Sequence, residues 1–185
     1  MPAFFNKFQK LPIAEWLLVQ QVKSGNKEAF GTLYSFYLDK IYRYIFFRVN
    51  QSTEIAEDLT EVSFVKAWEK IDLYKKEGGS FSSWLYTIAR NTVIDHFREQ
   101  NRLTSLPDEQ IDDGNDTEEK MLITFELERV QEAMKDLTVE QQEIITLKFI
   151  NDMSNKEIAV FLGKNEDAIR ALQYRALQEL RKRLK

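Results

Sequence analysis

The sequence predicts an all-α protein in which two small helical domains are joined by an acidic, flexible linker. Apolar residues recur at the i, i+3, i+4 spacing of helices over long stretches, and no stretch shows the strict alternation of a strand. Only three prolines and six glycines interrupt the 185 residues. One segment rich in acids lacks any apolar period and separates two helical regions. We therefore expect domains at 1–102 and 121–185, with the linker at 103–120.

The first domain is expected to be a helical bundle. Its first helix covers about residues 13–23 and ends at the Ser-Gly-Asn segment 24–26, because glycine commonly follows the last residue of a helix. The second helix covers about residues 27–49 and carries a broad apolar face. Ser52 or Thr53 can cap the third helix, since a short hydroxyl side chain satisfies the first free backbone N–H groups.

A loop is expected between the third and fourth helices. Residues 74–80 have the sequence YKKEGGS, and two adjacent glycines are costly inside a helix. The fourth helix then runs from about Phe81 to Asn101. The loop combines two lysines with flanking aromatic residues, a composition suited to holding one unstacked base. The alternative is that the aromatic residues Phe81 and Trp84 are simply part of the core.

The second domain is expected to resume helical structure at about Glu118. Thr138 is a suitable N-cap for a helix over Val139–Ile150. Ser154 can cap the next helix, and Glu157 completes an S-x-x-E capping box. Two helices of this domain therefore have defined starting points.

The composition bounds the class of protein. Hydrophobic residues make up 43% and charged residues 30%, which is typical of a folded chain. The absence of cysteine excludes disulfides and cysteine-ligated zinc and is compatible with a reducing compartment. No apolar run reaches the ~20 residues that cross a bilayer, and the first residues lack the order of a signal peptide. We expect a cytoplasmic protein without membrane insertion.

The charge is unevenly distributed along the chain. The net charge is −4, which by itself argues against a nucleic-acid binder. However, residues 105–120 hold seven acids and one lysine, whereas residues 164–185 hold seven basic residues and three acids. The acidity therefore lies largely in the linker and the basicity at the C-terminal end.

A twenty-residue window that begins at Asn155 has the spacing of a helix-turn-helix. The small Ala159 allows close approach of the second helix, and Gly163 lies where the turn favours a positive φ. The apolar positions that bury the inner faces are Ile158, Leu162, Ile169 and Leu172. The outward face of the second helix is expected to present Asn165, Glu166, Arg170, Gln173 or Tyr174, and Arg175.

Such an outward face can hydrogen-bond base edges or phosphates in a DNA major groove. The alternative is an ordinary helical hairpin whose charges form a solvated face, and such hairpins often satisfy two or three of these positions. All six positions, together with the capping box and the basic end, favour DNA binding. The pattern does not say which DNA sequence is bound.

The N-terminal domain carries a resemblance to a known family. The segment AEDLT at 56–60, followed by FVKAW at 64–68, resembles the polymerase-binding helix of sigma-70-type factors. The segment WLYTIARNTVIDHFR at 84–98 looks like the promoter-melting segment of the extracytoplasmic-function group of that family. The helix-turn-helix is similar to the family's second domain. The resemblance covers about residues 23–102 and 127–184.

This resemblance implies core RNA polymerase and promoter DNA as partners, with an anti-sigma factor as a family expectation. It implies three sets of site residues. For polymerase binding these are Asp58, Leu59, Thr60, Phe64 and Trp68. For the minus-10 element they are Tyr74, Lys75, Lys76, Ser80, Phe81, Trp84, Arg90 and Asn91. For the minus-35 element they are Lys164, Asn165, Arg170, Ala171, Tyr174 and Arg175.

Two positions depart from the family's usual pattern. From Thr60, the last residue of DLT, the chain reads TEVSF, so the acid lies one place early, which affects the detail of the polymerase contact. In the second helix of the helix-turn-helix, residues 169–173 are IRALQ where the family often has VRSRL. Ala171 replaces a hydroxyl with a methyl group, which favours apolar contact with thymine.

Nothing in the sequence indicates an enzyme. It has no P-loop, no GxGxxG and no acid cluster at metal-ligand spacing, and its single histidine, His96, is expected at a surface or interface. We expect no catalytic residue, metal or cofactor. The runner-up function is a helix-turn-helix regulator whose N-terminal helices sense a signal or dimerise. A helical adaptor without DNA contact ranks last.

Overall fold

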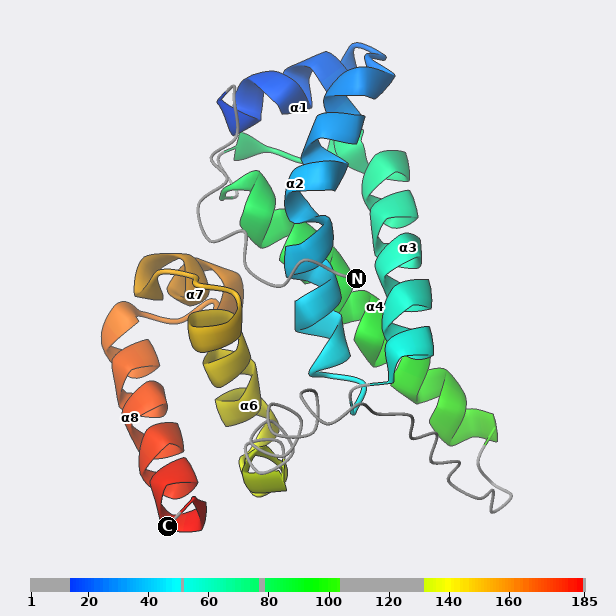
Figure 1. Ribbon diagram of the computed structural model, residues 1–185. Coiled ribbons are helices and arrows are strands. Elements are labelled where there is room, and N and C mark those ends of the chain that lie inside the picture. The colour runs from blue at the N-terminus through cyan, green and yellow to red at the C-terminus, as the bar shows by residue number, and fades with distance from the viewer. Residues whose placement is uncertain (1–13, 51, 77–78, 104–131, 185) are drawn as a thin grey trace, which may run out of the picture. The chain divides into compact units, whose positions relative to one another are not determined.

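The computed structural model describes residues 14–50, 52–76, 79–103 and 132–184 (Figure 1). The chain divides into two compact units, Met1–His96 and Phe97–Lys185, and each is described by itself. Every element in the described ranges is helical, which confirms the predicted all-α fold. The expected linker lies outside the described residues, apart from Leu103 at the end of a helix. None of the described helices is both long and apolar enough to span a membrane.

The first two helices of the first unit begin and end where local signals place them. Helix α1, Glu15–Lys23, is followed by Gly25 at φ 94°, and α2, Lys27–Phe46, begins after Asn26. The Asn26 side chain accepts hydrogen bonds from two backbone N–H groups of the first turn of α2. Helix α2 ends three residues before the predicted Val49, because the chain passes into turns that lead to Asn50 at φ 53°.

Three long helices build the core of this unit. Helix α3, Thr53–Glu69, begins after the capping residue Ser52, and a short 3-10 turn, η1, covers Ile71–Leu73. Helix α4 covers Phe81–Leu103, and its residues up to His96 belong to this unit. Aromatic side chains join the helices: Tyr34 of α2 meets Phe64 of α3 with ring centroids 4.7 Å apart, and Tyr44 meets Tyr86 of α4 at 5.3 Å. The buried aliphatic residues between them include Leu33, Ile41, Ile45 and Leu85.

The α-helices α6 to α8 of the second unit range from seven residues in α6 to 18 residues in α8. Residues 132–135 are helical and precede α6, Val139–Ile145. A π-helical turn, η3, covers Thr146–Ile150, so the helix predicted over Val139–Ile150 changes its winding at Thr146. The Asn151 N–H donates to the Thr146 carbonyl at 3.0 Å, the wider spacing of a π turn. Helices α7, Asn155–Leu162, and α8, Glu166–Arg183, follow.

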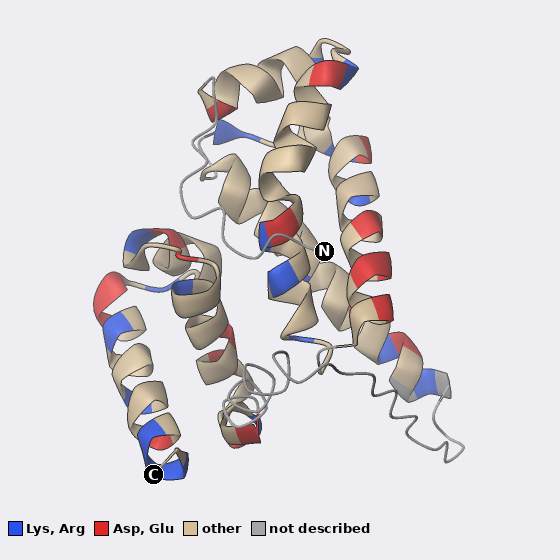
Figure 2. Cartoon of the chain, in the orientation of Figure 1, with Lys and Arg blue, Asp and Glu red and all other residues tan. Residues whose placement is uncertain are grey.

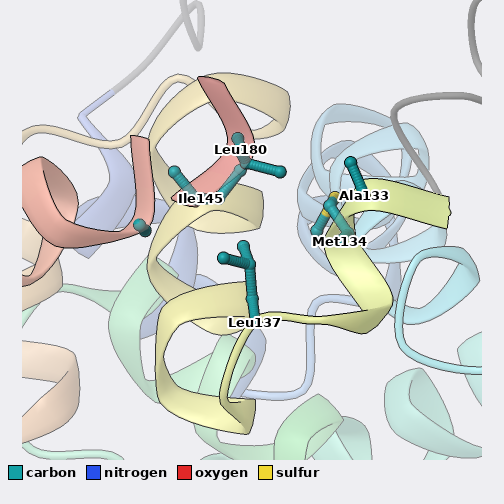
Figure 3. Close-up of a cluster of buried hydrophobic side chains, with 6 residues drawn as sticks. Ala133, Met134, Leu137, Ile145 and Leu180 are labelled. Atoms are coloured by element: carbon teal, nitrogen blue, oxygen red, sulfur yellow. The ribbon is translucent and has the colours of Figure 1, made fainter. Parts of the chain in front are cut away.

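The core of the second unit is a small apolar cluster. Figure 3 shows Ala133, Met134 and Leu137 facing Ile145 and Leu180, and the sixth member is Ala176. The cluster joins residues before α6 to α6 itself and to the C-terminal half of α8. This packing fixes α8 along its inner side and leaves its other side exposed.

Candidate nucleic-acid interface

Helices α7 and α8 form the predicted helix-turn-helix. Ile158 and Ile169 are completely buried, and Ala159 and Leu172 are nearly so, which confirms the predicted inner faces at these positions. The fourth apolar position, Leu162, is half-buried. Across the pair, the Gln173 amide donates to the Asn155 side-chain oxygen at 3.0 Å. Gln173 therefore ties the two helices together.

The turn between the helices is fixed by local geometry. Gly163 has φ 64° and ψ 34°, the left-handed conformation predicted for it, where a side chain would be strained. Ser154 and Glu157 form the predicted capping box at the start of α7. Asn165 caps α8, and its side-chain oxygen accepts a hydrogen bond from the Ala168 N–H at 2.8 Å. Both helices of the motif thus have side-chain caps.

Two residues predicted to meet DNA at this turn have structural contacts. The side-chain oxygen of Asn165 serves as the cap, so its amide nitrogen is the group that remains to donate outward. The Lys164 ammonium lies 2.9 Å from a carboxylate oxygen of Glu140 on α6. The lysine side chain is still one third exposed, and it lies at the N-terminal end of α8.

The exposed face of α8 carries four of the predicted minus-35 residues. Arg170, Ala171, Tyr174 and Arg175 are all exposed, and Tyr174 is 66% exposed although it is aromatic. Figure 2 shows basic residues along α8 and towards its C-terminal end. This face combines guanidinium donors, a methyl group and a phenol, the mixture that reads base edges and phosphates in a major groove.

Arg170 is paired within its own helix. One guanidinium nitrogen lies 3.1 Å from the Glu166 carboxylate and the other 3.5 Å from that of Asp167. Acids in the first turn of a helix are favoured by the helix dipole. Because the arginine and both acids are exposed, these pairs are weak and easily exchanged for another anion.

In the first unit, the predicted minus-10 residues divide into buried aromatic groups and exposed donors. Tyr74 and Phe81 are 5% and 1% exposed, and Trp84 is half-buried. Their three rings form a cluster with centroids 5.5–5.8 Å apart. Lys75 and Lys76 are exposed. The aromatic rings thus serve mainly to support the backbone segment that carries the two lysines.

The remaining predicted minus-10 residues lie at the start and middle of α4. Ser80 is exposed, and its hydroxyl oxygen caps the helix by accepting from the Ser83 N–H at 3.1 Å. About two turns beyond Trp84 on α4, Arg90 is half-buried and Asn91 exposed. Asn91 therefore lies on the exposed side of α4, whereas Arg90 is partly covered.

The predicted polymerase-binding residues also separate by burial. Asp58 is exposed and Trp68 is 36% exposed, with its ring 4.9 Å from that of Phe30. Leu59, Thr60 and Phe64 are buried, and the Thr60 hydroxyl donates to the Ala56 carbonyl at 2.6 Å. These three side chains face the core of the unit instead of the exposed side of α3.

Sequence reasoning missed two exposed apolar residues on α3. Val62 and Val65 are 41% and 55% exposed, and they follow Asp58 at i+4 and i+7. That spacing places all three on one helix face, so the sequence held the signal. Contiguous exposed apolar patches mark binding surfaces, whereas single exposed aliphatic residues are common on any protein.

The described residues contain no group of three or more potential metal ligands. The sequence has no cysteine, and both candidate surfaces are exposed helix faces with donors and apolar groups.

Comparisons with known proteins match both units. Residues 33–103 match the family described as Sigma-70 region 2, and residues 127–180 match Sigma-70, region 4. The chain is similar to the ECF RNA polymerase sigma factor BldN of Streptomyces coelicolor, at 38% identity over 88% of this chain and 63% of that protein. It therefore spans less than two thirds of the length of BldN.

Two further relatives match over most of their own length. The ECF RNA polymerase sigma factor SigX of Bacillus subtilis is 30% identical, over 85% of this chain and 84% of that protein. The solved structure of CnrH in complex with the cytosolic domain of CnrY is similar at a TM-score of 0.70 and 27% identity. That match covers 93% of this chain and 97% of CnrH.

Proposed function

Since this chain belongs to the extracytoplasmic-function group of the sigma-70 family, we propose that it joins core RNA polymerase and directs transcription initiation from specific promoters. The observation that carries the proposal is a capped helix-turn-helix with an exposed recognition face, in the same chain as a region 2 match. A DNA-binding helix alone is equally compatible with a regulator. The match of residues 33–103 to Sigma-70 region 2 supports the sigma-factor proposal over the regulator.

In this proposal, α8 reads the minus-35 element as duplex DNA. Arg170 and Arg175 donate to base edges or phosphates, while the Ala171 methyl and the Tyr174 ring make apolar contacts. Lys164 and the Asn165 amide approach the backbone at the N-terminal end of the helix, where the helix dipole favours phosphate. Phosphate contacts set the position of the helix, and base contacts set its preference.

The first unit binds the minus-10 element while the DNA duplex opens there. Lys75 and Lys76 supply positive charge to the backbone of an unpaired strand, and Ser80, Arg90 and Asn91 supply further donors. Trp84, which is half-buried, supplies part of its indole ring for contact with an unpaired base. Tyr74 and Phe81 support this surface from below, because their rings are buried.

The exposed face of α3 is the proposed polymerase contact. Asp58, Val62, Val65 and Trp68 combine a carboxylate with exposed apolar surface. Burial of the apolar side chains against the polymerase would supply affinity, and the Asp58 carboxylate would favour a positively charged surface on the partner. Leu59, Thr60 and Phe64 act from within by holding α3 on the core.

We assign the protein a cytoplasmic location and no catalytic step of its own, since phosphodiester chemistry belongs to the polymerase. An anti-sigma factor is a further proposed partner. The solved structure of the relative CnrH contains the cytosolic domain of CnrY, which shows that a chain of this fold can be held by another protein.

Reconstitution with core RNA polymerase tests the proposal. The full chain is mixed with core enzyme and a library of linear templates that are randomised at two hexamers, and initiated transcripts are sequenced. We expect enrichment of specific bases in both hexamers, with weak DNA binding by the chain alone. Tight binding to a palindrome without polymerase, and no specific initiation with it, would instead establish the regulator function.

A further inference from the structure

Helix α1 holds both ends of the loop that carries the minus-10 lysines. We define the 71–81 loop by its described residues, 71–76 and 79–81. At one end, the Lys23 ammonium donates to the Tyr74 carbonyl at 2.7 Å and to the Asp72 carbonyl at 3.3 Å. At the other end, a Glu15 carboxylate oxygen accepts from the Phe81 N–H at 3.2 Å. Glu15 and Lys23 are the first and last residues of α1.

The Glu15 contact is built into the core of the unit. Its second carboxylate oxygen accepts a hydrogen bond from the hydroxyl of Tyr37 on α2. Burial, followed by the charge of Glu15, raises the pKa of Tyr37, so that hydroxyl stays protonated and remains a donor. Phe81 is the first residue of α4, and a carboxylate at a helix N-terminus is stabilised by the helix dipole.

The Lys23 contact fixes the end of the loop at Asp72 and Tyr74 and is also supported by further contacts. The lysine is half-buried, and its ammonium also lies 5.9 Å from the centroid of the Tyr74 ring. The Tyr74 hydroxyl in turn donates to the Gly79 carbonyl at 3.0 Å, which closes the loop across its own span. A third contact joins Lys76 to α1, since its ammonium lies 5.2 Å from the centroid of the Trp16 ring.

Because both ends of α1 contact the loop, the length of this helix sets the distance between the two ends of the loop. A helix of nine residues rises about 12 Å between its first and last residues, and its two ends are tied to the two ends of the loop. A binding site that depends on backbone position loses selectivity when its support allows small displacements. The contacts of α1 limit such displacements at both ends of the loop, next to the exposed Lys75 and Lys76.

We propose that α1 is a brace for the 71–81 loop, and that Lys23 and Glu15 are positioning residues for minus-10 selectivity although neither touches DNA. This inference rests on the proposed function of the loop. It adds residues outside the region 2 match, which begins at residue 33. Loss of the Lys23 ammonium would free one end of the loop while α2, α3 and α4 stay packed.

The test compares Lys23→Met, Lys23→Arg and the control Lys27→Met, each as full chain with core polymerase on the randomised template library. Methionine keeps the apolar stem of Lys23 and removes its donors. Lys27 is an exposed lysine at the start of α2. For Lys23→Met we expect about a tenfold loss of selectivity in the minus-10 hexamer and an unchanged minus-35 hexamer. Lys23→Arg should restore selectivity, because arginine can donate to two carbonyls.

Two companion measurements separate positioning from folding. All three tryptophans, Trp16, Trp68 and Trp84, lie in the first unit, so urea unfolding followed by tryptophan fluorescence reports that unit alone. Hydrogen exchange should be faster in the 71–81 loop of Lys23→Met and unchanged in α2 and α3. If Lys23→Met lost selectivity equally at both hexamers, or kept its minus-10 selectivity, the proposal that α1 braces the loop would be wrong. Failure of the unaltered chain to enrich any minus-10 sequence would instead overturn the proposed function.

Discussion

At the scale of single residues, Arg170 is exposed, and its ion pairs are weak enough to break when another ligand binds. Its guanidinium is paired with Glu166 and Asp167, whose side chains are 43% and 94% exposed. Exposed pairs of this kind contribute about 0–1 kcal/mol each. A bidentate contact with a base edge contributes about 1–3 kcal/mol of discrimination and can therefore replace them.

We predict that Arg170→Ala weakens discrimination in the minus-35 hexamer by about 1–3 kcal/mol and leaves the minus-10 hexamer unchanged. Initiation from templates with single base substitutions measures both effects. Arg181→Ala, an exposed arginine in the last turn of α8, is the matched control and should lower initiation evenly across sequences. An Arg170→Ala protein with the normal minus-35 preference would remove Arg170 from base readout.

Residues whose roles depend on local geometry were predictable, and those whose roles depend on burial were less so. Gly163 and Ser154 follow from the spacing of a few neighbours, and the structure shows the expected left-handed turn and capping box. Phe81 and Thr60 were assigned to partner contacts by resemblance, yet they lie in the core. Their burial depends on helices distant in the sequence, such as the packing of Phe81 against Tyr37 of α2.

At the scale of elements, short helices of the second unit begin at reciprocal caps. Thr138 and Gln141 form one capping box at the start of α6, and Ser154 and Glu157 form another at the start of α7. Helices α6 and α7 have seven and eight residues, too short to be stable alone. Capping and packing must therefore compensate for the cost of starting each helix.

We predict that Ser154→Ala destabilises α7 by about 1 kcal/mol, because Glu157 N–H loses its acceptor and Glu157 loses the hydroxyl donor. Hydrogen exchange of the α7 amides should become roughly fivefold faster, while peptides from the first unit serve as an internal reference. Ser35→Ala on the exposed side of α2 is the matched control and should leave exchange nearly unchanged. Equal exchange rates in α7 of Ser154→Ala and the unaltered chain would show that packing alone maintains the helix.

Element identities were more predictable than element ends. The sequence predicted each described long helix of the first unit, since apolar periodicity over many residues is a strong signal. It missed the π turn at Thr146–Ile150, because one extra residue in a turn leaves almost no trace in a short apolar pattern. It also extended α2 to Val49, a residue that is buried beyond the end of the helix.

At the scale of the whole molecule, the distribution of charge explains how an acidic chain can read DNA. The net charge is −4, yet residues 164–185 hold seven basic residues and three acids. The described part of that segment is α8 with its preceding turn. Phosphate contacts supply most non-specific affinity, so a chain with this balance should bind DNA weakly by itself. Polymerase would then supply affinity, and α8 would select the site.

The acids at 105–120 should contribute to that weak binding. They lie outside the described residues, and the prediction rests on their charge and their covalent tether to the basic α8. We predict that converting all seven acids to amides, which changes the net charge from −4 to +3, raises the affinity of the free chain for random duplex DNA about tenfold at low salt. The gain should shrink at high salt, because screening weakens interactions between exposed charges.

Fluorescence anisotropy with a labelled duplex of random sequence, at two salt concentrations, measures the effect. The matched control keeps the composition of residues 105–120 and changes only their order. It should bind DNA as the unaltered chain does, since a tethered anion competes with phosphate through its charge and local concentration, whatever its sequence. If the scrambled chain bound more tightly, the order of these residues would matter and a specific contact would replace the electrostatic explanation. If the amide variant bound no more tightly, weak binding would have to arise from α8 itself, where Glu166 and Asp167 already occupy Arg170.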